Sequence, residues 1–216
     1  MSSAAQAGTN ATAPGVDKVR VVGVSKQFTR QEKGATEVIQ ALDNVSLTVR
    51  PGELVALTGQ SGCGKTTLLR VLMGLEQVTA GTVEVDGRVI DGPGPDRAMV
   101  FQHAELLPWR SALGNVEFGL EARGSLKRQE RRDQARAYLS LVGLEGAMHR
   151  KPYELSGGMR QRVGMARALA IQPEVLLMDE PFGALDAQTR EQLQQEVLRI
   201  HDERDQTIVF VTHDLD

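Results

Sequence analysis

The segment Gly59–Thr66, with the sequence GQSGCGKT, constrains this chain more than any other part of it. It fits the pattern G-x-x-x-x-G-K-[ST] at every fixed position, and it lies between an apolar run, Glu53–Thr58, and a predicted helix, Lys65–Met73. Its glycines allow the backbone to curl until N–H groups point at a phosphate, and the helix N-terminus adds positive potential. A loop that merely turns the chain is the alternative, but the flanking strand and helix favour phosphate binding.

The side chains of this loop predict that it binds a nucleotide together with a metal ion. Lys65 would reach the β- and γ-phosphates, and the Thr66 hydroxyl would hold Mg²⁺. Cys63, the single cysteine, is interpreted as a spacer because no base or metal ligand is visible nearby. The residues expected to bind ATP here are Gly59, Gln60, Ser61, Gly62, Cys63, Gly64, Lys65, Thr66 and Thr67.

Two adjacent carboxylates follow a second apolar run. The predicted buried strand Glu174–Met178 leads directly to Asp179 and Glu180. Asp179 suits the Mg²⁺ shell, and Glu180 could orient and deprotonate an attacking water. An ordinary strand that ends in an acidic turn is the alternative, and the phosphate loop in the same chain disfavours it.

The distance between these two elements narrows the class of protein. Lys65 and Asp179 lie 114 residues apart, far more than one βαβ unit needs, and a predicted helical block fills the gap. Within it, Ser156 opens the predicted helix Ser156–Ala170, and it could simply cap that helix. The functional alternative is a second phosphate-seeking helix N-terminus. That would make sense if two chains met and each helix closed the other's nucleotide site.

The remaining patterns predict the fold class. Strands are expected at Val19–Val24, within Val38–Val49, and at Thr82–Val85, Arg88–Ile90, Ala98–Phe101 and Thr207–Thr212. The Asp86-Gly87 pair is typical of a type I′ hairpin turn. Helices are expected at Asn115–Ala122, Leu126–Val142 and Ala187–Asp202. Strands and helices alternate at both ends of the chain, which predicts an α/β core interrupted by a helical insertion.

Six motifs together resemble those of the nucleotide-binding subunits of ABC transporters, in that family's order and spacing, from about Val19 to the last residue. They are GQSGCGKT, the glutamine of VFQ (Gln102), LSGGM, LLMDEP, ALD and VTHD. The resemblance implies a P-loop NTPase with a RecA-like core and an antiparallel β subdomain, interrupted by a helical subdomain that carries the signature LSGGM. The implied parts are a disordered leader at 1–17, the core at 18–102 and 171–216, and the helical subdomain at 103–170.

The resemblance also implies roles for side chains near the nucleotide. Phe28 looks like the aromatic residue that stacks on adenine, although it could equally be a core residue. Gln102 resembles the loop glutamine that touches Mg²⁺ and the attacking water. His213 resembles the switch histidine that holds the γ-phosphate.

Other implied contacts require two chains. Ser156, Gly157 and Gly158 resemble the signature that contacts the γ-phosphate of the partner chain's ATP, which implies an ATP-dependent homodimer. Asp186 resembles the loop aspartate that links the two sites. Met159 stands where many members carry Gln, and we expect little effect because that side chain is not the phosphate contact.

Two further positions depart from the family's pattern. Gly183 occupies a position that is often Ser. The chain ends at Asp216, directly after VTHD, whereas members usually continue with further helices and strands. We therefore expect either a natural truncation or a fragment.

A finer match concerns the segment FQHAELLPW, Phe101–Trp109, followed by Asn115-Val116. It looks like the nitrate, sulfonate and taurine branch of bacterial importers. In that branch, Glu105–Ser111 would be where a membrane permease subunit docks. Trp109, the single tryptophan, could instead pack in the helical core, and the sequence favours neither reading.

Composition excludes several other classes. Among 216 residues, 25 Lys and Arg stand against 28 Asp and Glu, so binding of nucleic acid by bulk charge is not expected. No basic n-region or apolar h-region opens the chain, and no apolar run approaches the ~20 residues of a spanning helix. The resemblance implies a peripheral protein on the cytoplasmic face of the inner membrane.

The sequence as a whole predicts an ATP-hydrolysing subunit that powers solute import through separate permease subunits, with a periplasmic solute-binding protein as an indirect partner. The solute suggested by the branch is nitrate, a sulfonate or taurine. Three alternatives stay open: a soluble ABC ATPase acting on nucleic acid or ribosomes, a P-loop kinase or GTPase, and a truncated ATP-binding form with little turnover.

Overall fold

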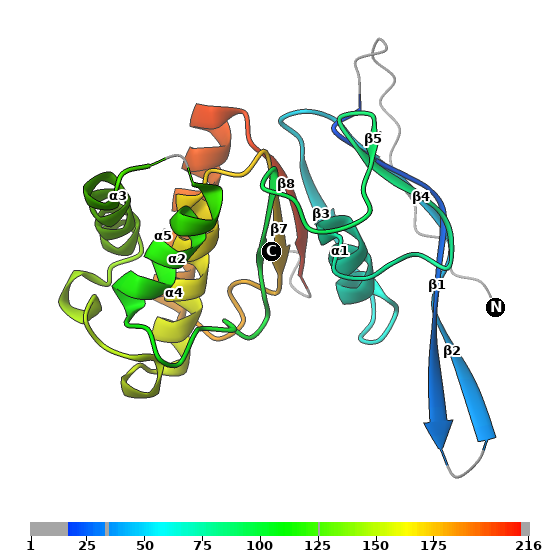
Figure 1. Cartoon of the computed structure of the whole chain (residues 1–216), viewed down its shortest axis with the longest axis horizontal. Coiled ribbons are helices and arrows are strands. Elements are labelled where there is room, and N and C mark those ends of the chain that lie inside the picture. The colour runs from blue at the N-terminus through cyan, green and yellow to red at the C-terminus, as the bar shows by residue number, and fades with distance from the viewer. Residues whose placement is uncertain (1–16, 33–34, 125, 213–216) are drawn as a thin grey trace.

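The structure, a computed structural model of the chain, describes residues 17–32, 35–124 and 126–212 (Figure 1). The leader expected at residues 1–17 lies outside the described residues, apart from Asp17. The described chain forms four layers. A group of helices stands on one side of a central sheet, and a single helix backed by an antiparallel sheet stands on the other side (Figure 1).

The central sheet consists of four short parallel strands in the order β3-β8-β7-β6. They are β3 (Leu54–Leu57), β6 (Arg97–Val100), β7 (Val175–Asp179) and β8 (Thr207–Val211). Helices cover both faces of such a sheet, which is why its strands read as continuous apolar runs. Along β7, Val175 and Leu177 face one hydrophobic core, whereas Leu176 and Met178 face the other.

A single helix, α1 (Lys65–Met73), covers one face of this sheet and has the bounds that the sequence predicts. Gly74 ends it with a φ of 81°, a left-handed conformation that glycine adopts without a steric penalty. Leu69 and Leu72 of α1 are fully buried between the two sheets. The helix therefore ties the antiparallel sheet to the central one.

The antiparallel sheet has the order β2-β1-β4-β5. Its strands are β1 (Val19–Glu32), β2 (Ala35–Val49), β4 (Ala80–Val85) and β5 (Arg88–Val89). Val19 and Val83 are among the valines buried against α1, whereas their neighbours Arg20 and Thr82 are exposed. The turn between β4 and β5 has positive φ at both central residues, 50° at Asp86 and 70° at Gly87, as a type I′ turn requires.

The helical layer covers the opposite face of the central sheet. It contains α2 (Ala112–Arg123), α3 (Arg128–Leu141), α4 (Gly157–Ala170) and α5 (Ala187–Arg204), with two 3₁₀ turns at Glu145–Ala147 and Pro152–Glu154. The middle of α4 is the most enclosed part, and Val163, Met165 and Ala166 have no exposed surface. Helix α4 contacts α2, α3 and β6, so it connects the helical layer to the sheet.

The arm formed by β1 and β2 extends beyond the predicted strands, and β4 also begins two residues earlier than predicted. The sequence indicates a strand at Val19–Val24, but β1 continues to Glu32 and pairs with β2 as far as Ala35, which gives the long arm in Figure 1. The reason is that the added residues are mostly polar and exposed. A two-stranded ribbon with both faces in solvent carries no apolar alternation from which it could be predicted.

The parallel topology brings three described loops to one edge of the central sheet, since the carboxyl ends of parallel strands meet there. The phosphate loop follows β3, Gln102 follows β6, and Glu180 follows β7. Within the described residues, no helix has both the length and the apolar character that crossing a bilayer requires.

Two glycines of the antiparallel sheet give a test of the fold. Gly81 and Gly87 both have positive φ, but a Cβ at Gly81 would lie 2.4 Å from the Gly23 carbonyl oxygen, whereas a Cβ at Gly87 would meet nothing within 4 Å. Gly87→Ala should therefore cost about 1–2 kcal/mol from the backbone alone. Gly81→Ala should cost clearly more, and urea unfolding of the two variants measures the difference. Equal losses would contradict the close approach of β1 and β4.

Candidate nucleotide site at the carboxyl edge of the sheet

The phosphate loop has a backbone shape that depends on its glycines. Gly59, Gly62 and Gly64 have φ values of 149°, 81° and 100°, outside the range that other residues readily adopt. A Cβ on Gly64 would lie 2.4 Å from the carbonyl oxygen of Ala41, whereas a Cβ on Gly62 would meet nothing within 4 Å. Gly64 therefore serves close packing against β2, and Gly62 stands beside open space on the outer side of the loop.

The side chain of Lys65 folds back onto the loop that precedes it. Its Nζ donates hydrogen bonds to the carbonyl oxygens of Gly59, at 2.6 Å, and Gln60, at 2.9 Å. Nζ also lies 3.8 Å from the sulfur of Cys63, which is exposed and free. The ammonium group is thus placed within an exposed ring of backbone, where an incoming phosphate could replace the carbonyl partners.

A threonine and an aspartate from distant parts of the chain meet beside this loop. The Thr66 hydroxyl donates a hydrogen bond of 3.1 Å to Oδ1 of Asp179, the buried last residue of β7. Burial raises the pKa of Asp179 and the nearby charge of Glu180 raises it further, against the lowering effect of the Thr66 hydroxyl. Hard oxygen donors such as these two are the ligands that Mg²⁺ prefers, so the pair fits that ion.

A second polar pair lies next to the first. Nε2 of Gln102 donates a hydrogen bond of 3.0 Å to Oε2 of Glu180, although 78 residues separate them. Glu180 has a φ of 46°, in the left-handed region, while its N–H donates to the Val211 carbonyl on β8. The backbone thus leaves the sheet sharply at Glu180, and a non-glycine residue in that conformation is a common feature of functional sites.

Two of the expected site residues act as helix caps. Oγ of Ser156 accepts a hydrogen bond from the Met159 N–H at the start of α4, as the capping alternative predicted. Asp186 caps α5 by accepting from the Thr189 N–H at 3.0 Å, and this hydrogen bond lowers the pKa of its carboxyl. These contacts explain the local structure of both residues without a nucleotide.

The structure also decides two alternatives that the sequence left open. Phe28 is not a core residue: 37% of its surface is exposed, and Nζ of Lys26 lies 4.8 Å from its ring centre. Trp109 does not pack in the helical core either, because 70% of its surface is exposed. Thr67 lies half-buried in the first turn of α1, and His213 lies outside the described residues.

Sequence reasoning assigned no role to three polar residues of the helical layer. Asn115, Gln161 and Arg167 all donate side-chain hydrogen bonds to backbone carbonyl oxygens of the segment 101–111. Asn115 and Gln161 are buried, with 0% and 3% of their surface exposed. The sequence feature that could have indicated these roles is a polar residue at a helical position that is otherwise apolar, such as Asn115 between Leu113 and Val116.

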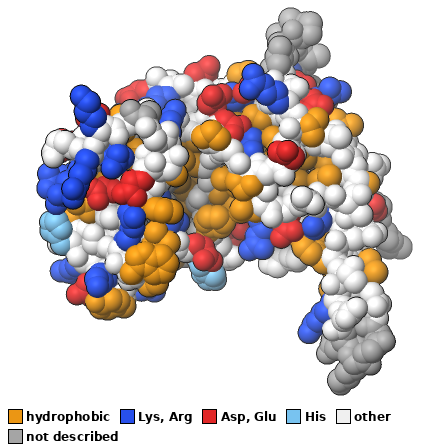
Figure 2. Space-filling model, viewed as in Figure 1, with side chains coloured by type: hydrophobic (Ala, Val, Ile, Leu, Met, Phe, Trp, Pro, Cys, Tyr) orange, Lys and Arg blue, Asp and Glu red, His pale blue; other side chains and the backbone are white. Residues whose placement is uncertain are grey.

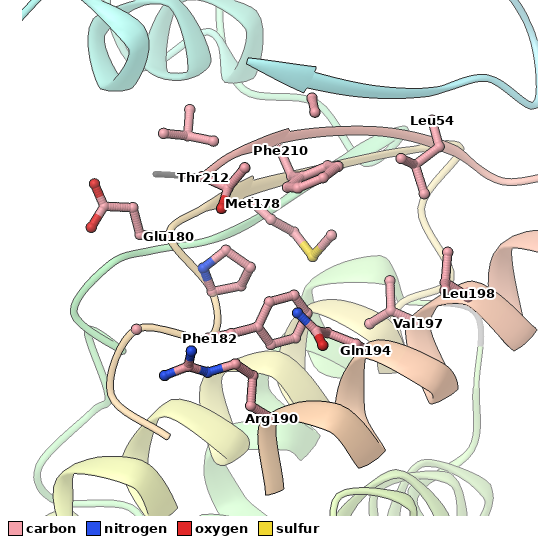
Figure 3. Close-up of a pocket in the computed structure, with 14 residues that line it drawn as sticks. Leu54, Met178, Glu180, Phe182, Arg190, Gln194, Val197, Leu198, Phe210 and Thr212 are labelled. Carbon is pink, nitrogen blue, oxygen red and sulfur yellow. The ribbon is translucent and has the colours of Figure 1, made fainter. Parts of the chain in front are cut away.

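A separate pocket of about 420 Å³ lies behind Glu180, between α5 and strands β3 and β8 (Figure 3). Its lining is mainly apolar and includes Phe182, Val197 and Phe210. The Glu180 carboxylate stands at its rim and points away from these side chains (Figure 3). No residue of the phosphate loop lines this pocket, so Glu180 is the one residue of the two polar pairs that it shares.

A model of the ABC transporter family matches residues 42–183, which include the phosphate loop, Gln102, the LSGGM segment and both carboxylates. The chain belongs to the ABC transporter family. The resemblance drawn from the six motifs is thereby confirmed.

Several curated relatives are similar over most of this chain. The nitrate import ATP-binding protein NrtD of Synechococcus elongatus is 51% identical over 177 residues, which are 82% of this chain and 65% of that protein. The bicarbonate transport ATP-binding protein CmpD of Synechocystis sp. is 52% identical over 81% of this chain and 62% of its own length. The chain thus spans somewhat less than two thirds of these relatives.

A solved structure shares the fold. It is a dimeric post-hydrolysis state of the ATP-binding cassette MJ0796 bound to ADP and Pi, and it superposes with a TM-score of 0.84 at 37% identity. The match covers 91% of this chain and 88% of that one. The predicted P-loop NTPase fold, with its antiparallel β subdomain and helical insertion, is confirmed.

Because the carboxyl of Asp179 is buried, we expect the substitution Asp179→Asn to increase the stability of the fold in a pH-dependent way. When folding raises the pKa of an acid, the charged acid destabilises the folded state at pH values above the raised pKa. The destabilisation disappears when the pH falls below the pKa that the acid has in the unfolded chain. Asparagine keeps an oxygen that accepts from Thr66 but carries no charge beside Glu180. The variant should therefore melt at a higher temperature than the parent at pH 7.5, and the difference should shrink as the pH falls toward 4. A variant less stable than the parent at both pH values would contradict this account.

Proposed function

We propose that this chain binds ATP with Mg²⁺ and hydrolyses it, as the subunit that powers the import of a small anion through separate membrane permease subunits. The observation that carries the proposal is the pair of hydrogen bonds, Thr66 to Asp179 and Gln102 to Glu180, beside the Lys65 loop. The names of the relatives support the anion, since they specify nitrate and bicarbonate. These names give less support to a sulfonate or taurine, the other solutes of the predicted branch, as the transported solute.

The phosphate groups of ATP would lie on the loop Gly59–Thr67. The Lys65 ammonium would exchange its carbonyl partners for phosphate oxygens, and the N–H groups at the start of α1 would add donors. The MJ0796 cassette supports the binding of a nucleotide, because its solved structure contains ADP and Pi. Phe28 would stack its exposed ring on the adenine.

Mg²⁺ would be held by the Thr66 hydroxyl and the Asp179 carboxylate, with Gln102 nearby. When bound, the ion neutralises charge on the phosphate oxygens. Deprotonated Asp179 is the form that binds a cation, so the ion would also offset the unfavourable burial of its charge.

Hydrolysis would use Glu180 as the general base. Its carboxylate accepts a proton from a water whose oxygen attacks the γ-phosphorus, and the bond to the bridging oxygen of ADP breaks as the new P–O bond forms. Gln102 donates its amide N–H to Oε2 of Glu180, and this hydrogen bond would hold the carboxylate in place for the water. His213, which lies outside the described residues, would hold the γ-phosphate.

The complete site would require two copies of the chain. Ser156, Gly157 and Gly158 lie at the exposed N-terminus of α4, in the part we assign to the helical subdomain at 103–170. Each chain would present this end of α4 to the ATP of the other, in a two-fold symmetric dimer, with Asp186 near the boundary between the sites. The dimeric state of the MJ0796 cassette supports this arrangement.

The permease would dock on the segment around Trp109. Buried Asn115 fixes this segment: Oδ1 accepts from the Leu107 N–H at 2.8 Å, and Nδ2 donates to carbonyl oxygens of Leu107, Arg110 and Ser111. Hydrophobic side chains gather at this edge of the helical layer (Figure 2), and Tyr153 is 74% exposed. Exposed aromatic residues on a rigid loop are typical of binding surfaces.

This assignment places the protein on the cytoplasmic face of the inner membrane, attached through its permease. A periplasmic solute-binding protein would deliver the anion to the opposite side of that permease. Nucleic acid has no part in the proposal, since the net charge is −3 and the segment KRQERRD mixes signs on the surface of α3.

Glu180→Gln tests the chemistry. The amide is nearly isosteric but cannot accept the proton of the water, so hydrolysis should slow by roughly 10²–10⁴-fold. ATP affinity should hold or improve, because one negative charge leaves the phosphate site. Light scattering should then show a doubled mass with ATP and Mg²⁺ but not with ADP. Lys65→Ala in the same background is the control and should stay monomeric, while hydrolysis at the parent rate would exclude Glu180 as the base.

Trp109→Ala tests the docking surface. The variant should keep the basal ATPase rate, since 70% of the Trp109 surface is exposed and its side chain belongs to neither polar pair. The reconstituted permease subunits should still stimulate hydrolysis, but half-maximal stimulation should need at least ~30-fold more permease. This loss of affinity is typical of removing a central aromatic contact. Leu198→Ala, which removes an exposed side chain of α5, is the matched control. Unchanged stimulation by Trp109→Ala would move the docking site elsewhere.

A further inference from the structure

Lys26 stands where the arm formed by β1 and β2 leaves the rest of the molecule. As far as Ser25, β1 pairs with both β2 and β4, and beyond it the described residues of β1 pair with β2 alone. Nζ of Lys26 donates a hydrogen bond of 2.8 Å to the carbonyl oxygen of Gln77 and lies 3.0 Å from Oε2 of Glu76, both in the loop after α1. Only 12% of the Lys26 side chain is exposed, so its ammonium group is held in a largely enclosed place.

The same ammonium group lies over the ring of Phe28. Its nitrogen is 4.8 Å from the ring centre, within the ~6 Å over which a cation and an aromatic face attract each other. Because Glu76 and Gln77 already fix the nitrogen, this attraction acts on the ring and favours one orientation of it. Since 37% of Phe28 is exposed, part of the ring stays accessible to a ligand.

The register of the arm places Phe28 close to the phosphate loop. Phe28 pairs with Ile39 on β2. Two residues further along β2, the carbonyl oxygen of Ala41 comes so near the phosphate loop that a Cβ on Gly64 would lie 2.4 Å from it. A strand rises about 3.3 Å per residue, so the two points lie roughly 7 Å apart along β2. One ribose joins the base of a nucleotide to its phosphates, and it can span a separation of this size.

A cation on one face of an aromatic ring also changes the other face. Both faces of a phenyl ring carry partial negative charge, and they repel the π electrons of a second ring stacked on them. An ammonium ion draws π electrons toward its own side, so the opposite face becomes less negative and accepts an electron-rich purine more readily. The contact with Lys26 would therefore strengthen stacking on Phe28 in two ways, by orienting the ring and by lowering this repulsion.

We propose that Lys26 is a positioning residue for the base of the nucleotide, which it serves by holding the Phe28 ring from the face opposite the adenine. This inference rests on the proposed function, which assigns Phe28 to the adenine, and it specifies what holds that ring in place. It predicts that the charge of Lys26 affects binding of the base and has no effect on binding of the phosphates.

Lys18, directly before β1, supplies a matched control. Its Nζ also has two partners, the carboxylates of Asp86, at 2.8 Å, and of Glu174, and 12% of its side chain is exposed, as for Lys26. Glu174 precedes β7, whereas Asp179 ends it, so Lys18 lies at the opposite edge of the central sheet from the nucleotide site. Lys18→Met and Lys26→Met both remove the charge and keep an unbranched side chain. Both should lower thermal stability, but only Lys26→Met should change nucleotide affinity.

The experiment measures the affinity of each variant for ADP and for pyrophosphate, both with Mg²⁺, by displacement of a fluorescent ADP. ADP carries the base and leaves the chain monomeric under the proposed function, whereas pyrophosphate offers the phosphates alone. Lys26→Met should weaken ADP binding roughly 3- to 10-fold, within the range of a partly desolvated cation–π contact, and leave pyrophosphate binding unchanged. Lys26→Arg keeps a cation over the ring and should restore ADP binding. Lys18→Met should match the parent with both ligands.

Phe28→Leu shows whether the effect of Lys26 passes through the ring. This variant should weaken the binding of ADP and not that of pyrophosphate, and the addition of Lys26→Met should cause no further loss. Glu76→Gln releases the ammonium group from its ion pair and serves as a second variant where Lys26→Met does not fold. It should show a smaller loss of the same kind, confined to ADP.

Three results would overturn the inference. Lys26→Met could bind ADP at least as tightly as the parent, it could weaken ADP and pyrophosphate alike, or its effect could persist in the Phe28→Leu background. The last two would mean that Lys26 only joins the arm to the loop after α1. Failure of the proposed function has a different signature, because the parent itself would then bind neither ADP nor pyrophosphate.

Discussion

The complete burial of β7 is the constraint on which the rest of this structure depends. All five of its residues are buried, and alternate side chains enter two separate cores. The strand can be covered on both faces only if α1 lies on one side and α4 with α5 on the other. Its last residue, Asp179, is then delivered to the start of α1, where the Thr66 hydroxyl meets it. The position of the acidic pair follows from packing of apolar residues.

This arrangement also concentrates like charges at one point. Asp179 and Glu180 are adjacent, and the chain keeps them apart by turning sharply at Glu180. One carboxylate is buried and accepts from Thr66, while the other accepts from Gln102 in the loop after β6. The two acids therefore have different surroundings, which is the condition for different roles: a buried carboxylate suits a cation, and one held at the rim suits a proton acceptor.

Much of this could be predicted from the sequence because the signals are local. The bounds of α1, the Asp86-Gly87 turn and the capping Ser156 each follow from a few neighbouring residues. The far end of the β1–β2 arm could not, since its polar residues have no periodicity. The hydrogen bond between Gln102 and Glu180 could be expected only from the family resemblance, because nothing near either residue indicates the other.

The side chains that bind backbone were the least predictable of all. Asn115, Gln161 and Arg167 pair with carbonyl oxygens, and every residue type supplies a carbonyl oxygen, so the partner leaves no mark on the sequence. Such contacts nonetheless determine where Gln102 and Trp109 lie, at the two ends of the segment 101–111. Side chains that bind backbone are for this reason the natural place to look for control of a site whose own residues are shared across a family.

The capping and functional readings of Ser156 are compatible on physical grounds. A serine hydroxyl has one donor hydrogen and two acceptor lone pairs, and the Met159 N–H uses only one lone pair. The donor hydrogen is still available for a phosphate oxygen. The cap in fact favours that use, because it fixes Oγ at the positive end of α4, beside the N–H groups that an anion would meet there. One hydrogen bond within the helix thus prepares the contact that a second chain would require.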